Sequence, residues 1–364
     1  MKIAILSVSE DGKKLSEDLK SILNTDSTVI KTDIYYKNVK DTIKNIWDSY
    51  DAIIAIMATG IIVRSIAPYI INKVKDPAVL SIDDKGKHVI SLLSGHLKGA
   101  NELTIKIANL IDAKPVITTS TDVNNKIGID TLANHFYFTL NDTKKILRFN
   151  KAILNDETIN LIANFNVSYI CDYLENFNNN FTLETEVFNN KFKKFTLEID
   201  ELYSINPNNT NIINDFDINN NYLIAILNNK NYLVMKEKVM VMGIGSRKNI
   251  SKNTVLIAIK KVMNELGMPM DRINIVATAE IKKDEWGIIE AVNTFKKPIN
   301  IVDINSIKKL NCPDCSKSEF VQKNFGIDGV SEQCALITAG KNSKLIYKKT
   351  AFDGVTIAIA IGDN

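Results

Sequence analysis

The sequence lacks any long apolar run. No stretch approaches the roughly eighteen consecutive apolar residues that a membrane-spanning helix requires. The amino-terminal stretch contains only the short apolar run 3–6 before Glu10 and Asp11, which is too short for the core of a signal peptide. We therefore expect no membrane association and a cytoplasmic location.

Cysteine and histidine are scarce, with four and three residues in a chain of 364. So few cysteines in so long a chain argue against a disulfide framework. Cys312 and Cys315 have the spacing of a zinc or redox pair. Zinc needs four ligands, however, and no second pair or nearby histidine appears, while a redox pair should open a helix directly after a strand. We expect neither a metal site nor a redox role, and we expect His88 and His135, which flank apolar runs, to be packed.

The charge balance lacks the clustered basic excess of nucleic-acid-binding proteins. The 45 Lys and Arg face 42 Asp and Glu, so the net charge of +3 is spread over the whole chain. A composition of 45% hydrophobic and 24% charged residues is typical of a soluble globular protein. At about 150 residues per domain, the length predicts two or three domains.

Residues 1–138 alternate short apolar runs with helical patterns. Strands are predicted at residues 2–6, 27–34, 51–57 and 115–119, and helices at residues 13–23, 39–47 and 97–111. This alternation predicts an α/β domain with a parallel or mostly parallel sheet flanked by helices. Ligands bind such sheets beyond the carboxyl ends of the strands, so polar loops that follow strands are the candidate sites.

The middle of the chain, residues 139–237, is asparagine-rich and weakly patterned. Runs at 222–227 and 232–235 flank Asn228, Asn229 and Lys230, which predicts a hairpin within a small α+β domain. From residue 238 to 364 the α/β alternation returns. Strands are predicted at residues 239–242, 273–277, 300–304, 335–338, 344–348 and 355–361, with a helix at 251–266.

The first candidate loop contains Thr59 and Gly60, directly after the predicted strand 51–57. A strand, a glycine and a helix start bring unpaired N–H groups and a positive dipole end together, which suits a carboxylate or phosphate. Arg64 is one helical turn further on and can form a bidentate contact. The alternative is a tight connecting turn with Arg64 in solvent.

The second candidate loop surrounds His96. Its polar and glycine residues are Ser94, Gly95, Lys98, Gly99, Asn101 and Glu102. At a helix N-terminus an imidazolium is disfavoured by roughly 0.3 to 1 kcal/mol, which predicts a neutral His96 suited to general-base chemistry. The alternative is that Ser94 or Asn101 only caps the helix, with His96 and Glu102 facing water.

Two further loops follow strands. Thr118, Thr119, Ser120, Thr121 and Asp122 come after the predicted strand 115–119, where they can bind a polar ligand, orient a histidine or cap a helix. Gly243, Gly245, Ser246, Arg247 and Lys248 come after strand 239–242 and predict an anion-binding turn. This turn lacks the third glycine of a dinucleotide fingerprint, and no P-loop is present. The charged run 282–285 is typical of a solvated face.

Taken together, these motifs resemble the CbiG family of cobalamin biosynthesis proteins, the cobalt-precorrin-5A hydrolases. The amino-terminal resemblance rests on residues 58–64, 76–79, 92–102 and 115–122. The carboxy-terminal resemblance rests on residues 243–247, 281–285, 318–321, 326–332 and 355–359. The asparagine-rich middle matches only by position. The chain departs from the family at Ser246, where cysteine is frequent, and at Lys98, where a small residue is expected.

The resemblance implies an enzyme that opens the δ-lactone of cobalt-precorrin-5A and releases acetaldehyde to give cobalt-precorrin-5B. Cobalt enters with the substrate, so no cofactor or protein metal site is expected. Binding of the substrate carboxylates is expected from the candidate loops, through Thr59, Gly60, Arg64, Ser94, Gly95, Lys98, Asn101, Thr119, Thr121, Gly243, Gly245, Ser246, Arg247 and Glu332. The expected partner is the cobalt-corrinoid substrate, with transient contact to neighbouring pathway enzymes left open.

Our mechanistic hypothesis has His96, oriented by Glu102 or Asp122, activate water against the lactone carbonyl. A rival hypothesis gives the catalytic role to Lys283 and Glu332 in the carboxy-terminal domain. Two alternatives lie outside this reaction. One is a noncatalytic corrinoid carrier or scaffold, and the other is an enzyme that binds nucleotides or phosphosugars.

Overall fold

The computed structural model describes residues 1–179, 181–184, 220–228 and 231–363. The chain divides into two compact units. The first contains Met1–Ser94, Ala100–Val116 and Lys238–Asn364, and the second contains Gly95–Gly99 and Ile117–Glu237. Each unit is described by itself below. No helix among the described residues is long and apolar enough to cross a membrane.

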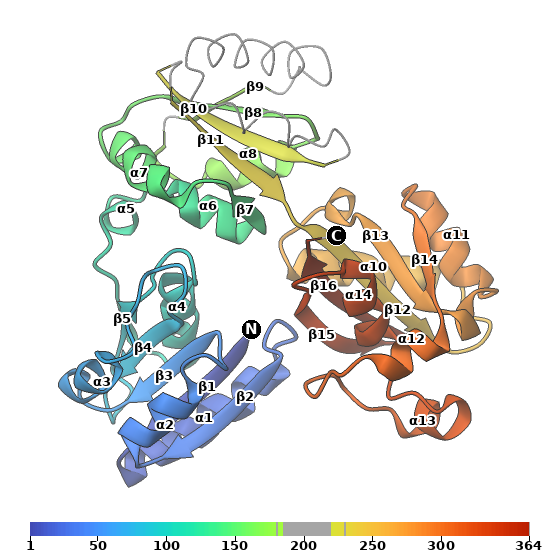
Figure 1. The fold of residues 1–364 in the computed structure, drawn as a ribbon, viewed down its shortest axis with the longest axis horizontal. Coiled ribbons are helices and arrows are strands. Elements are labelled where there is room, and N and C mark those ends of the chain that lie inside the picture. Colours follow the sequence, from blue (N-terminus) through green and yellow to red (C-terminus); the bar gives the residue numbers. More distant parts are fainter. Residues whose placement is uncertain (180, 185–219, 229–230, 364) are drawn as a thin grey trace. The chain divides into compact units, whose positions relative to one another are not determined.

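The first unit contains a six-stranded amino-terminal sheet in the order β2-β1-β3-β4-β5-β6 (Figure 1). Its strands are β1 (Lys2–Ser7), β2 (Lys31–Tyr36), β3 (Ala52–Ile56), β4 (Ala78–Ile82), β5 (His88–Leu93) and β6 (Lys114–Val116). All neighbouring pairs are parallel except β4 and β5. The predicted mostly parallel sheet is therefore confirmed.

Four helices cover both faces of this sheet. They are α1 (Glu10–Thr25), α2 (Val39–Ile46), α3 (Thr59–Ile66) and α4 (Ala100–Leu110). Alternate residues of β1 face opposite sides, as a strand requires. Ile3 and Ile5 lie in one core with apolar residues of α1 and α4, whereas Ala4 and Leu6 lie in another with those of α2 and α3.

The carboxy-terminal part of the first unit has a five-stranded sheet in the order β14-β13-β12-β16-β15. Its strands are β12 (Val239–Ser246), β13 (Ile275–Ala279), β14 (Ile299–Val302), β15 (Lys344–Phe352) and β16 (Val355–Gly362). The strands β12, β13 and β14 are parallel, and β16 runs antiparallel to both β12 and β15. Its helices are α10 (Lys252–Glu265), α11 (Trp286–Thr294), α12 (Ile304–Lys309), α13 (Glu319–Phe325), α14 (Ser331–Ala339) and the single turns η3 (Met270–Arg272) and η4 (Glu280–Lys282).

The strand predicted at residues 335–338 is wrong, because these residues belong to helix α14. The run lacks an exposed polar face because α14 is almost wholly buried and contacts β12, β13 and β16. A helix that is buried all round has no polar face, and a short apolar run of this kind cannot be distinguished from a buried strand by periodicity.

The second unit has a five-stranded sheet in the order β7-β11-β10-β8-β9. Its strands are β7 (Phe138–Leu140), β8 (Ile159–Ala163), β9 (Phe181–Glu184), β10 (Tyr222–Leu227) and β11 (Asn231–Glu237). Its helices are α5 (Ser120–Val123), α6 (Ile129–His135), α7 (Ile146–Leu154), α8 (Ser168–Leu174) and the turn η1 (Thr143–Lys145). The antiparallel pairing of β10 with β11 confirms the predicted hairpin strands.

Some of the asparagine-rich segment, residues 185–219, and the hairpin residues 229–230 lie outside the described residues. The units also divide the chain differently from the predicted ranges 1–138, 139–237 and 238–364. Residues 117–138 lie in the second unit, together with the turn 95–99. The physical reason is that β7, which follows α6, pairs with β11 of the second unit's sheet.

Candidate functional site

His96 lies in the second unit, where it contacts three polar side chains. Its Nε2 atom lies 2.9 Å from Asp122 Oδ2 and 3.1 Å from Thr121 Oγ1. Its Nδ1 atom lies 3.4 Å from Asp130 Oδ1. The side chain of His96 is only 12% exposed and that of Asp122 is 28% exposed. The imidazole is therefore held between an inner and an outer carboxylate.

Asp130 is the inner of the two carboxylates, and its side chain is 3% exposed. Its Oδ1 atom accepts a hydrogen bond from Asn150 Nδ2 at 2.9 Å. Asn150 is itself fixed, because its Oδ1 accepts from the N–H of Ile129 at 2.9 Å. This chain of contacts joins α7 to the start of α6 and sets the position of the imidazole.

The two carboxylates determine the charge of His96. Burial alone would lower its pKa, but the hydrogen bonds and charges of Asp122 and Asp130 outweigh burial and raise the pKa from 6.5 to about 9. The expectation of a neutral His96 is therefore wrong. That expectation assumed that His96 lies at a helix N-terminus. In the structure α4 begins at Ala100, and His96 lies in the preceding turn, Gly95–Lys98.

Of the residues predicted to surround His96, the structure brings Thr121 and Asp122 to the imidazole. Asp130 was missed by the sequence analysis. It lies 34 positions after His96, beside the apolar residues Ile127 and Ile129, and a single buried acid in such a run is its only local signal. Gly95 and Lys98 belong to the same turn as His96, and Thr119 precedes α5 as its N-cap residue without a side-chain capping bond.

Ser94, Asn101 and Glu102 belong to the first unit. The Oγ atom of Ser94 donates to the carbonyl of Asp76 at 3.2 Å, at a residue with a positive φ of 60°. Asn101 is buried and accepts from Ser91 Oγ at 2.6 Å. Glu102 is exposed in the first turn of α4. None of these contacts assigns a chemical role to the three side chains.

The loop after β3 has the predicted form of strand, glycine and helix. Thr59 and Gly60 occupy the first turn of α3, and Thr59 Oγ1 lies 3.2 Å from Ser81 Oγ. A Cβ on Gly60 would lie 3.3 Å from a guanidinium nitrogen of Arg64, so the guanidinium group folds back against the glycine. Gly60 and Arg64 are both exposed, which leaves a cation beside open backbone at the carboxyl end of β3.

The predicted glycine turn at Gly243 and Gly245 is wrong, because β12 continues through Ser246. Both glycines are buried inside this strand. A Cβ on Gly243 would lie 1.8 Å from the carbonyl oxygen of Ser331, and one on Gly245 would lie 2.6 Å from Thr356 Oγ1. The glycines allow α14 and the neighbouring strand to approach β12 closely, so their place is in the packed interior rather than in an open anion-binding loop.

Glu332 is also buried, with 1% of its surface exposed. Its carboxylate accepts from the N–H of Ser316 at 2.6 Å and from the N–H of Lys349 at 2.8 Å. It therefore stabilises the connection between two backbone segments. Lys283 is exposed at the end of η4, and nothing in its surroundings assigns it a catalytic role.

Ser246 and Arg247 follow one another at the end of β12. Ser246 Oγ is buried and has no hydrogen-bond partner among the described residues. Arg247 is exposed, its N–H donates to the carbonyl of Gly354 at 2.8 Å, and its side chain lies over Gly354.

The structure also places Cys312, Cys315, His88 and His135, and only some of the expectations for them are confirmed. Cys312 and Cys315 are joined by a disulfide. His135 is packed as predicted, since its ring stacks on Tyr173 with centroids 4.1 Å apart. The prediction for His88 is wrong, because its side chain is 54% exposed and lies 3.4 Å from Asp83.

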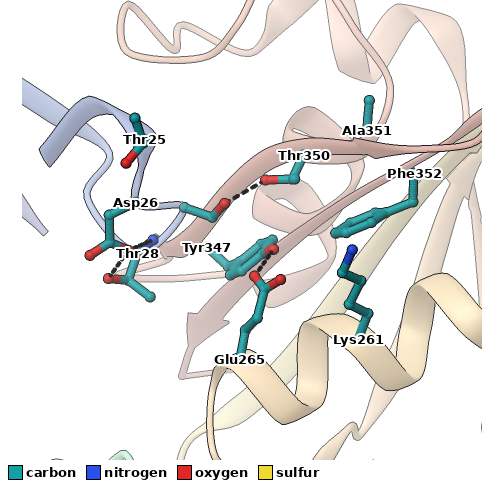
Figure 2. A pocket seen from close by; sticks show the side chains of 10 residues that line it. Thr25, Asp26, Thr28, Lys261, Glu265, Tyr347, Thr350, Ala351 and Phe352 are labelled. Atoms are coloured by element: carbon teal, nitrogen blue, oxygen red, sulfur yellow. Dashed lines mark hydrogen bonds between the residues drawn. The ribbon is translucent and has the colours of Figure 1, made fainter. Parts of the chain in front are cut away.

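A polar pocket that the sequence analysis missed lies in the first unit (Figure 2). Its volume is about 530 Å³, and it is lined by Thr25, Asp26, Ser27, Thr28, Lys261, Glu265, Tyr347, Thr350, Ala351 and Phe352. Glu265 accepts from the Tyr347 hydroxyl at 2.6 Å, and the ammonium of Lys261 lies over the ring of Phe352. The pocket includes none of the predicted site residues, and its charged groups already interact with neighbouring side chains.

Two family models match the chain. Residues 41–122 match the cobalamin synthesis G amino-terminal model, and residues 240–360 match the carboxy-terminal model of the same family. The first match contains His96, Thr121 and Asp122, and the second contains β13, β14, β15 and most of β12 and β16. Asp130 and Asn150 lie outside both matched ranges.

Full-length relatives agree with these matches. A probable cobalt-precorrin-5A hydrolase from Methanocaldococcus jannaschii is 32% identical over 99% of both chains. The cobalt-precorrin-5A hydrolase from Priestia megaterium is 27% identical over 98% of this chain and 94% of its own. The crystal structure of a cobalamin biosynthesis protein G homologue from Sulfolobus solfataricus has a TM-score of 0.58 and 26% identity, and covers 99% of this chain and 97% of its own.

Proposed function

The chain belongs to the CbiG family of cobalamin biosynthesis proteins, and we propose that it is a cobalt-precorrin-5A hydrolase of the pathway to vitamin B12. The observation that carries the proposal is the 32% identity over 99% of both chains with a relative described by that activity. The substrate is a carboxylate-fringed macrocycle that contains cobalt, so the metal belongs to the substrate. The reaction opens the δ-lactone and releases two carbons as acetaldehyde.

The geometry around His96 supports a charged imidazole as the proton donor for lactone opening. Both ring nitrogens face carboxylates and the pKa is about 9, so the ring is an imidazolium near pH 7 and both nitrogens are donors. Asp122 is the more exposed carboxylate and is the proposed proton acceptor. This assignment reverses the role of His96 in the original hypothesis and keeps the residue in the reaction.

In the proposed first step, water attacks the lactone carbonyl carbon and gives a proton to Asp122. The ring C–O bond then breaks, and the imidazolium of His96 protonates the leaving oxygen. Thr121, which contacts both His96 and Asp122, positions the pair. Proton transfer from Asp122 to His96 restores the starting charges, so the net change is the addition of one water.

In the proposed second step, the new alcohol loses its proton to Asp122. The adjacent C–C bond breaks, the alcohol carbon leaves as acetaldehyde, and the bonding electron pair enters the conjugated macrocycle, which takes up a proton. The same outer carboxylate thus serves both steps. Asp130 holds the imidazole throughout and is a positioning residue, since it is buried behind the ring.

The substrate carboxylates require cations that face solvent. Within the first unit, Arg64 and Arg247 both follow strands at their carboxyl ends and are exposed, so we propose that each can bind a carboxylate. Lys98 lies in the turn that contains His96, and we propose the same role for it.

The test is anaerobic incubation of the pure protein with cobalt-precorrin-5A, with trapping of acetaldehyde and the mass of the corrinoid product as readouts. Stoichiometric acetaldehyde supports the proposal. Tight binding of substrate and product without acetaldehyde would instead indicate a corrinoid carrier or scaffold. Stabilisation by phosphorylated ligands and none by corrinoids would indicate a nucleotide- or phosphosugar-binding enzyme.

A further inference from the structure

Trp286 is 70% exposed, and among the large aromatic side chains of the described residues only Phe320, at 71%, is more exposed. The other tryptophan, Trp47, is 4% exposed. Trp286 begins α11, shortly after β13. Because β12, β13 and β14 are parallel, their carboxyl ends share one edge of the sheet, where α/β proteins bind ligands (Figure 1). An indole in water at this edge is available for contact with a ligand.

The residues on both sides of Trp286 are fixed against the loop that follows β12. The carboxylate of Glu285, which is 8% exposed, accepts from the N–H of Ile250 at 3.1 Å. A Cβ on Gly287 would lie 1.9 Å from the carbonyl oxygen of Ile250, so backbone meets backbone there. Trp286 therefore lies between two residues that contact the Ile250 backbone, and its indole is exposed although the backbone on both sides is packed.

The loops around Trp286 present more exposed cations than exposed acids. Arg247, Lys248 and Lys252 follow β12 without an acid among them, and Lys283 follows β13. Two of the three acids of the second loop, Glu280 and Glu285, interact with neighbouring groups. Glu285 contacts the Ile250 backbone and lies 3.6 Å from Lys282, and Glu280 accepts from the N–H of Ile304 at 3.3 Å. Asp284, between Lys283 and Glu285, is an exposed acid, so the exposed aromatic face lies beside a charged rim in which cations outnumber acids.

We propose that Trp286 stacks against the face of the tetrapyrrole macrocycle while Lys248 and Lys283 bind its peripheral carboxylates. This inference rests on the proposed function, because it takes the occupant to be the substrate of that reaction. A flat conjugated ring with a rim of carboxylates is complementary to an exposed indole with lysines nearby. Lys283 then contributes to binding, in place of the catalytic role that the rival hypothesis gave it.

The two tryptophans provide a direct test. Cobalt-precorrin-5A absorbs light and should quench the emission of Trp286 strongly when it stacks on the indole, whereas the buried Trp47 can be quenched only by energy transfer without contact. Titration of the wild-type protein under anaerobic conditions should show saturable quenching. Trp286→Phe should lose most of this quenching but retain an aromatic surface, so its KM should rise much less than that of Trp286→Ala.

Trp286→Ala removes the aromatic surface and should raise KM about tenfold, with kcat changed much less. The matched control is Ile257→Ala. Ile257 lies on α10, beside the same sheet, and its apolar side chain is also exposed, at 66%. Lys248→Ala should weaken binding and reduce its dependence on salt.

The outcomes separate the two proposals. If the wild-type protein releases no acetaldehyde and corrinoids do not quench its emission, the proposed function and this inference both fail. If the wild type is active but Trp286→Ala keeps the wild-type KM, or quenching in Trp286→Phe is as strong as in the wild type, the inference on Trp286 is wrong and the proposed function stands. A fall in kcat alone would also contradict it, because a stacking residue acts on binding.

Discussion

The imidazole of His96 and the carboxylate of Asp122 lie 2.9 Å apart, and a second carboxylate occupies the other side of the ring. With a pKa of about 9 the ring is an imidazolium near pH 7, which has no lone pair to offer to water and has two N–H groups. The pair is therefore arranged to donate a proton from His96 and to accept one at Asp122. The predictions that follow separate this arrangement from that of a neutral base.

Removal of the imidazole should abolish most of the activity. His96→Ala is expected to reduce the rate of acetaldehyde release by about 10² to 10⁴-fold, the usual contribution of a positioned acid or base. The measurement is single-turnover acetaldehyde release. His88→Ala is the control, because His88 is exposed elsewhere and should retain full activity. Unchanged release by His96→Ala would exclude a catalytic role for this residue.

The charge of His96 should appear as a pH dependence of stability. The folded pKa is about 9 against an ordinary 6.5, so the protonated imidazole stabilises the fold fully below pH 6.5, and this contribution is lost as the pH rises through 9. Thermal unfolding of wild type and His96→Gln should therefore differ most near pH 6 and least near pH 10. A difference that does not change with pH would contradict the assignment.

Asp130→Asn tests the role of the inner carboxylate. Loss of one negative charge should lower the pKa of His96, so the fall in activity at alkaline pH should begin at a lower pH than in the wild type. Asp172→Asn, at an exposed acid of α8 in the same unit, should leave the profile unchanged. If Asp130→Asn reduces only the stability and leaves the shape of the profile as it was, Asp130 is structural and does not set the charge of His96.

The contrast between Asp122 and Asp130 shows how far the sequence reaches. Asp122 follows a predicted strand in a hydroxyl-rich loop, so the rule that candidate sites follow strands selected it, and the structure brings it to His96. Asp130 follows no such strand and lies in a short helix whose position depends on the second unit's fold. The charge of His96 depends on both acids, so it could not be predicted before the three side chains were seen together.

The same limit explains the errors in the carboxy-terminal sheet. Periodicity located β12, α10 and β16 because their patterns are local. Periodicity gave the wrong structure for Gly243 and for residues 335–338, because the glycine and the helix that contains this run are packed against each other. Helix α14 lies on β12, and the absence of a side chain at Gly243 makes room for it. A contact between residues almost ninety positions apart leaves no mark on either local pattern.

Glu332→Gln should affect stability more than catalysis. The buried carboxylate accepts hydrogen bonds from the backbone N–H groups of Ser316 and Lys349, one at each oxygen. A glutamine has only one acceptor oxygen, so it can replace these hydrogen bonds only in part. We expect a loss of about 1 to 3 kcal/mol of unfolding free energy, measured by denaturant titration, with kcat of the folded fraction close to that of the wild type. A large fall in kcat at unchanged stability would instead support the rival mechanism through Glu332.

Gly243→Ala distinguishes a packing glycine from a ligand-binding one. The new Cβ would lie 1.8 Å from the carbonyl oxygen of Ser331 and 3.0 Å from Ala335 Cβ, so α14 must move away from β12. Overpacking against backbone typically costs about 1 to 3 kcal/mol or more, and we expect a marked fall in the melting temperature. Gly267→Ala is the control. It meets no atom within 4 Å, and its φ of +64° should cost only about 1 kcal/mol. If Gly243→Ala kept the wild-type melting temperature and lost only affinity for the corrinoid, the glycine would belong to the binding site after all.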